Sequence, residues 1–158
     1  MSSLQVIEMM AGYDAEGQPV AEKLRVRVNE DNECELVNSP AFIKGLASGD
    51  VIKLDQQTGQ FEIKRRSGNL CIRVFSKDNI EPLAESLGSE IEKLGGMLDI
   101  ETPRMLVFSI HVSCGFTAIE DILNKAMTSS TAWYYGNVYD PVDGQTPLNW
   151  WQEILGEK

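Results

Sequence analysis

The residues of this chain with the clearest capacity for chemistry are a thiol and an imidazole, Cys114 and His111, which form an H-x-x-C pair. Cys114 precedes a predicted helix, and a thiol close to a helix N-terminus can have a lowered pKa and react as a thiolate. A nucleophilic cysteine also needs a base, and His111 is the one histidine in the sequence. No Asn or Asp stands out that would orient the imidazole. We therefore interpret His111 first as a neutral, hydrogen-bonded strand residue, and keep a Cys/His enzyme as an alternative.

No metal or cofactor site is expected from the sequence. A lone histidine cannot complete a zinc site unless cysteine or carboxylate ligands lie at suitable spacing, and none do. Gly45 and Gly49 lie four residues apart, but no Lys-Ser/Thr pair follows and the segment leads into a predicted strand, so a phosphate loop is not indicated. We therefore predict neither a metal nor a cofactor.

Aromatic residues are concentrated near the C-terminal end of the sequence. Tyr135 and Tyr139 lie in a predicted strand, and Trp150 and Trp151 lie in a predicted short helix that Thr146 and Pro147 would begin. Adjacent helical residues point about 100° apart, so one Trp can dock on the body of the protein while the other stays partly exposed. Trp and Tyr are favoured anchors at interfaces, so these four aromatics are our candidate binding residues. Packing within the chain is the alternative.

These side chains would be positioned by alternating strands and helices over residues 70–140. Leu70, Ile72 and Val74 recur with the period of two that is typical of a strand with one apolar face. Later segments show helical spacing or further alternation, and turn residues separate them. The expected elements are strands at 70–75, 97–101, 105–113 and 132–139, and helices at 80–94 and 117–127.

This order predicts an α+β fold with a ferredoxin-like β-α-β-β-α-β core. The second helix is expected to begin at a capping box, Thr117 to Glu120. Alternating apolar residues and polar turns before the core predict a lobe rich in β-hairpins. We divide the chain into a β-rich lobe at 1–69, the ferredoxin-like lobe at 70–140, and a turn with a short helix at 141–158, all packed as one unit. Whether the first lobe covers the helix-free face of the core sheet stays open.

Composition places the chain among ordinary globular proteins. It has 158 residues, of which 42% are hydrophobic and 24% charged, so it can bury a substantial core and is not expected to be disordered. No apolar run approaches the roughly 20 residues that a membrane helix needs, and no signal peptide is visible. Its 3 cysteines are odd in number and widely spaced, which favours a reducing compartment. We expect a cytoplasmic protein.

The formal net charge of −10 limits the choice of partners. Phosphate backbones and anionic membrane surfaces repel such a chain, so we expect neither nucleic acid nor a membrane as a ligand. Solubility alone can explain the charge. A basic protein partner is the more specific interpretation, because complementary fields speed encounter and restrict partner choice. Homodimer formation is left open.

The first half of the chain resembles a bacterial family of unknown function. The segment Asn38-Ser39-Pro40-Ala41-Phe42 is similar to that family's N-x-P-F-like stretch, with one extra residue. Gly45-Leu46 and Gly49-Asp50-Val51 resemble its G-[LI]-x-x-G-D-x-V motif, and Arg66-Ser67-Gly68 resembles its R-S-G turn. The resemblance implies a small bacterial cytoplasmic protein and supplies no activity or catalytic residues. These positions are otherwise expected to serve turns and packing.

Three hypotheses for function follow. The first is an acidic protein-interaction module, like an immunity protein or an adaptor, that binds a basic partner. The second is a domain that senses a small ligand, which rests on analogy of fold and not on a site. The third is the enzyme that uses Cys114 and His111.

Overall fold

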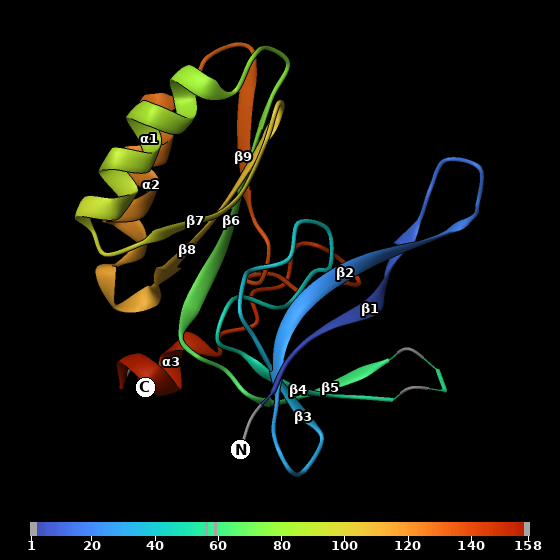
Figure 1. Ribbon diagram of the computed structural model, residues 1–158. Coiled ribbons are helices and arrows are strands. Elements are labelled where there is room, and N and C mark those ends of the chain that lie inside the picture. Colours follow the sequence, from blue (N-terminus) through green and yellow to red (C-terminus); the bar gives the residue numbers. More distant parts are fainter. Residues whose placement is uncertain (1–2, 56, 59, 157–158) are drawn as a thin grey trace.

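The computed structural model describes residues 3–55, 57–58 and 60–156 and shows a mixed α+β fold whose sheets are antiparallel (Figure 1). Within these residues one sheet has the strand order β1-β2-β3-β4-β5 and the other has the order β7-β8-β6-β9. The elements of the first sheet are β1 (Ser3–Tyr13), β2 (Pro19–Val28), β3 (Glu33–Leu36), β4 (Val51–Leu54) and β5 (Phe61–Arg65). The second sheet and the helices comprise β6 (Asn69–Ser76), α1 (Glu81–Lys93), β7 (Met97–Thr102), β8 (Met105–His111), α2 (Phe116–Ala126), β9 (Thr131–Tyr135) and α3 (Trp151–Leu155).

The first sheet is a meander of hairpins, as the alternation of apolar and charged residues predicts. Leu24 and Val26 of β2 are buried, whereas Arg25 and Arg27 are exposed. β1 is a long edge strand, and its pairing with β2 runs from Ser3 opposite Val28 to Tyr13 opposite Pro19. The two strands form a ribbon that extends away from the rest of the protein (Figure 1).

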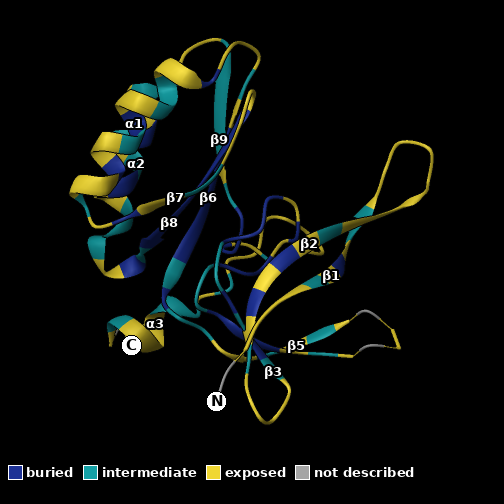
Figure 2. Cartoon of the chain, viewed as in Figure 1, coloured by how far each residue is buried: buried dark blue, intermediate teal, exposed yellow. Residues whose placement is uncertain are grey.

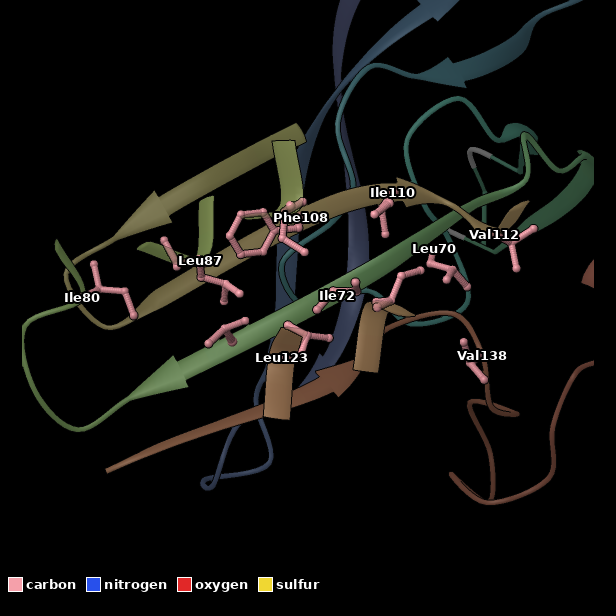
Figure 3. Packing of buried hydrophobic residues seen from close by; sticks show 13 residues of the cluster. Leu70, Ile72, Ile80, Leu87, Phe108, Ile110, Val112, Leu123 and Val138 are labelled. Carbon is pink, nitrogen blue, oxygen red and sulfur yellow. The ribbon is translucent and has the colours of Figure 1, made fainter. Parts of the chain in front are cut away.

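The second sheet carries α1 and α2 on one face. Leu70 and Ile72 of β6 point to this face and are fully buried there with Phe108 of β8 and Leu123 of α2 (Figure 3). Val74 of β6 is fully buried in the same cluster. The period-two pattern that predicted one strongly apolar face is therefore confirmed. α1 ends at Lys93, and Gly95 follows with a φ of 85°, the left-handed conformation that ends many helices.

The opposite face of the second sheet is covered by the long connection between β3 and β4. Ala41 and Ala47 of this connection are buried against Cys71 of β6 and Val107 of β8. Much of the connection is buried although it has no regular secondary structure (Figure 2). The first lobe therefore supplies the cover of the helix-free face.

The predicted start of α2 is wrong. The N-cap residue is Gly115, with a φ of 91°, and no side chain caps the helix. β8 ends at His111 and a 3-10 turn, Val112–Cys114, leads into Gly115, so Thr117 already lies inside the first helical turn. Its hydroxyl therefore cannot act as the N-cap that the capping-box pattern predicted.

The predicted helix at the C-terminal end is also shorter than expected, because α3 begins only at Trp151. The Thr146 hydroxyl donates to Asp143 Oδ2 at 2.5 Å and does not cap a helix. Pro147 forms an isolated bridge with Tyr139, which returns the chain alongside the segment after β9. The strand expected at 132–139 stops at Tyr135.

Candidate functional site

Cys114 and His111 have different hydrogen-bond partners in the structure. The Cys114 thiol donates to the carbonyl oxygen of Leu94 at 3.0 Å, at the end of α1. The His111 Nδ1 accepts a hydrogen bond from the Ser113 backbone N–H at 3.2 Å and lies 2.8 Å from the Ser113 hydroxyl. Within the part of the chain that the structure describes, no hydrogen bond joins the thiol to the imidazole. This geometry is that of a hydrogen-bonded histidine at the end of a strand.

Trp150 and Trp151 pack against the body of the protein. Trp150 Nε1 donates to the Asn137 carbonyl oxygen at 2.8 Å, and the Arg66 guanidinium lies 5.4 Å from the centre of the Trp150 ring. The Trp151 ring meets Phe116 edge-on at a centroid distance of 5.1 Å. Both tryptophans are partly buried against the core beneath α1 and α2. They therefore lie together and serve internal contacts.

Tyr135 and Tyr139, by contrast, line a groove with a cavity volume of about 650 Å³. Its walls combine aromatic rings with two cations and one carboxylate. The lining residues are Ala41, Phe42, Lys44, Arg73, Phe75, Glu120, Trp133, Tyr134, Tyr135, Tyr139 and Gly144. This volume is within the range of roughly 300–1,000 Å³ that is typical of ligand pockets.

The groove follows the outer edge of β9. Three consecutive β9 residues line it, although successive side chains of a strand point to opposite faces of the sheet. Trp133 and Tyr135 point to the α2 side, where Trp133 Nε1 donates to Asn124 Oδ1 and the Tyr135 hydroxyl donates to Glu120 Oε2. Tyr134 points to the other side, beside Phe75. In the described part of the chain, no strand pairs with this edge of β9.

The wall on the loop side is fixed by Arg73, a buried cation on β6. Its guanidinium donates to the carbonyl oxygens of Pro40, at 3.1 Å from Nη2, and of Ile43. Among the described residues no carboxylate forms an ion pair with it. Gly136 makes room for this side chain, because a Cβ at that position would lie 3.1 Å from the Arg73 Cζ atom.

Glu22 of β2 holds the same loop from the other side. Its carboxylate accepts hydrogen bonds from three successive backbone N–H groups, those of Ala41 at 2.6 Å and of Phe42 and Ile43 at 3.0 Å each. A carboxylate from the first sheet and a guanidinium from the second thus satisfy the donors and acceptors of one loop. We call residues 40–43 the clamped loop. The clamp leaves Phe42 exposed, where it lines the groove.

The segments that carry the resemblance build a polar junction between the sheets. Buried Asp50 accepts hydrogen bonds from the backbone N–H groups of Ala47 and Ser67 and lies 3.9 Å from the Arg66 guanidinium. Burial raises the pKa of the Asp50 carboxyl, although these bonds and Arg66 oppose the shift. Gly49 has a φ of 83°, and a Cβ there would lie 2.8 Å from the Ser67 Cβ. These residues act in turns and packing.

A second polar cluster pins the loop to β7 and β8. Ser39 and Ser48 both bond to the Ser109 hydroxyl, at 2.6 Å and 2.9 Å, and Ser109 donates to Asp99. Asp99 lies where the pairing of β7 with β8 shifts register, which turns its side chain toward the loop.

Burial changes the pKa of two side chains near the loop and the groove. Cys71 is fully buried, and burial raises the pKa of its thiol to about 11. Burial also raises the pKa of the Tyr135 hydroxyl, with Glu120 beside it, so this hydroxyl stays a donor.

Sequence reasoning therefore found two groove residues, Tyr135 and Tyr139, and missed most of the others. Arg73 gave a signal, since it is a charge on the second face of a strand otherwise rich in apolar residues. Phe42 gave none, because its place in the groove depends on the fold of an irregular loop.

Among the described residues no group of three or more His, Cys, Asp or Glu side chains could hold a metal ion. No described helix is long and apolar enough to cross a membrane.

Comparison with known proteins gives a family but no activity. The model of a family described as a domain of unknown function (DUF4265) matches residues 22–135, which include strands of both sheets. No curated protein matches the chain. A solved structure of a hypothetical protein from Neisseria gonorrhoeae is similar, with a TM-score of 0.69, 17% sequence identity, and coverage of 85% of this chain and 94% of that chain. At this identity the likeness shows the fold alone.

Proposed function

We propose that this chain, which belongs to the family described as a domain of unknown function (DUF4265), is a protein-interaction module that receives an extended segment of a basic protein at the edge of β9. The observation that carries the proposal is the outer edge of β9, which no strand of the described residues pairs with and along which an aromatic groove runs. An exposed edge offers backbone donors and acceptors to an added strand, and side-chain pockets beside it give specificity.

Two further features favour a protein as the partner. Aromatic rings are preferred anchors at interfaces, and Phe42, Tyr134 and Tyr139 at the groove are all exposed. The net charge of −10 would speed encounter with a positively charged protein and repel nucleic acid. We place the protein in the cytoplasm of a bacterium, in keeping with the resemblance and with its unpaired cysteines.

The second sheet suits this role in its topology. We interpret it as ferredoxin-like, because β6-α1-β7-β8-α2-β9 follows the β-α-β-β-α-β order and both helices pack on one face. In this arrangement β7 and β9 are the edges of the sheet. The clamped loop and residues 139–144 border the β9 edge and give it side-chain pockets.

A library of peptides displayed on phage tests the proposal. Peptides selected on the wild-type protein should carry a net positive charge, and their affinity should fall as salt is raised from about 50 to 500 mM. Methylation of alternate backbone nitrogens should abolish binding, because an added strand loses its bonds to β9. Selection of no peptide, or binding that tolerates backbone methylation at every position, would overturn the proposal.

The volume of the groove also favours a second candidate, a domain that senses a small ligand. A ligand that binds the native state alone must raise the melting temperature, so a thermal-shift screen of metabolites tests this function. A true ligand should lose its effect in Tyr139→Lys, which places a charged side chain at the groove. Absence of any shift across a broad panel argues against this candidate.

A further inference from the structure

The two sides of the β9 groove differ in charge. On the α2 side lie Glu120, Trp133 and Tyr135, and on the loop side lie Lys44 and Arg73. A strand added at the edge of β9 would direct successive side chains to these two sides in turn. The charges of the groove therefore bear on which sequences can occupy it.

The α2 side has the chemistry of a cation site. Glu120 Oε2 accepts the Tyr135 hydroxyl at 2.8 Å, whereas its Oε1 has no partner in the part of the chain that the structure describes. The Trp133 and Tyr135 rings meet edge-on beside it at a centroid distance of 4.9 Å. A carboxylate oxygen next to aromatic rings suits an arginine or lysine side chain, which gains a charge-assisted hydrogen bond and contacts with the rings.

The loop side has the opposite character. Arg73 Nη1 makes one long contact, 3.5 Å to the Phe42 carbonyl oxygen, while Nε and Nη2 hold the clamped loop. Lys44 is exposed, and among the described residues it forms no ion pair. Two cations that have no carboxylate partner among the described residues favour an acidic side chain at this side of the groove.

We infer that the partner segment is a strand in which an arginine or lysine that meets Glu120 stands at odd spacing, one or three residues, from an acidic residue that meets Lys44 and Arg73. The inference rests on the proposed function and specifies the class of partner segment. Odd spacing is required because only residues of opposite parity reach opposite sides of the edge. The overall negative charge of the protein still favours a partner that is basic as a whole.

Four pools of synthetic nine-residue peptides, with a strand-forming background of Val and Thr, test the inference by fluorescence polarisation. One pool carries Arg and Glu at odd spacing, one carries them at even spacing, one carries two Arg and one carries two Glu. The odd-spaced pool should bind about tenfold more tightly than each of the other three pools, since each of those loses one charge-assisted bond.

A matched pair of variants identifies the residue responsible. Glu120→Gln keeps an oxygen to accept the Tyr135 hydroxyl, and it should remove the preference for odd spacing. Asp121→Asn removes the same charge from the next residue of α2, which does not line the groove, and should leave the preference intact. Equal binding of the odd- and even-spaced pools, or equal effects of the two variants, overturns the inference and leaves the proposed function standing. Failure of every pool, together with failure of the phage selection, overturns both.

Discussion

The two faces of the second sheet are built on different physical principles. The face beneath α1 and α2 is a continuous apolar core that includes Ile72, Phe108 and Leu123. The face beneath the clamped loop contains small apolar contacts, such as Ala41 on Val107. It also contains a network of hydrogen bonds from Arg73, from Glu22, and among the hydroxyl groups of Ser39, Ser48 and Ser109. One face depends mainly on the area of apolar surface removed from water, and the other depends on directional bonds.

This difference decides how each face responds to substitution. Apolar burial is non-directional, so a cavity weakens the helix face without changing which elements pack on it. The loop face holds irregular backbone whose donors and acceptors need specific partners, so loss of one partner exposes several groups at once. We therefore expect the helix face to control global stability and the loop face to control local opening.

The largest effect is expected from Phe108→Ala on the helix face. Phe108 is fully buried, and truncation of a buried Phe typically lowers the free energy of unfolding by about 3–5 kcal/mol. Urea denaturation followed by circular dichroism measures this change. Phe75→Ala, on the loop face and 37% exposed, is the control and should cost much less. Equal costs for the two would remove the energetic distinction between the faces.

Arg73→Met should have the next largest effect, a loss of about 2–3 kcal/mol, because the carbonyl groups of the clamped loop lose their donors. Labelling of Cys71 by a disulfide reagent should then become much faster, since the loop that covers it opens. Loss of the neighbouring positive charge would by itself raise the Cys71 pKa and slow labelling, so faster labelling reports opening.

This measurement uses a background in which Cys34 and Cys114 are replaced by Ser. The matched control is Arg65→Met, where the side chain is 71% exposed and labelling of Cys71 should not change. In the wild type a Cys71 pKa of about 11 together with full burial should keep labelling slow at pH 8. Labelling of Cys71 at the same rate in both variants would show that Arg73 does not hold the loop.

Glu22→Gln should have a smaller effect, about 1–2 kcal/mol, because the amide keeps one acceptor oxygen for the loop. The loss should appear locally, as faster hydrogen exchange at the amides of Ala41, Phe42 and Ile43. Glu8→Gln is the control, since Glu8 is an exposed carboxylate on the neighbouring strand. Unchanged exchange at the three loop amides would contradict the clamp.

The smallest effect is expected from the pH dependence of Asp50. Burial raises its pKa in the folded state, so the folded protein holds the proton more tightly than the unfolded chain does. The contribution of Asp50 to the free energy of unfolding is then fully present below about pH 4, the ordinary aspartate range, and decreases as pH rises through the raised pKa. The stability of the wild type minus that of Asp50→Asn should therefore fall between pH 4 and neutrality. A difference that rises with pH would reverse the sign of the shift.

The sequence predicted the helix face better than the loop face for a physical reason. Periodicity is a property of neighbouring residues, so the spacing of Leu70, Ile72 and Val74 predicts that they share a face before the fold is known. The clamped loop depends on partners such as Glu22 and Arg73, which lie about 20 to 30 positions away in the chain. No local pattern identifies such bonds.

The candidate site was predicted in part for the same reason. A high density of aromatic residues singled out Tyr135 and Tyr139, which line the groove, but equally Trp150 and Trp151, which are partly buried against the core. The choice between these uses depends on which surfaces the rest of the chain leaves open. Phe42 and Lys44 line the groove only because the connection between β3 and β4 crosses the second sheet.

The covering loop has a consequence for any attempt to divide the protein. A fragment that starts at residue 70 would keep every strand and both long helices of the second sheet, with the first residue of β6 removed. It would nevertheless lay bare Cys71 and Val107, and leave the Arg73 charge without its carbonyl acceptors. We expect such a fragment to be aggregation-prone. We therefore expect the gene segments that encode the two lobes to be inherited together in natural recombination.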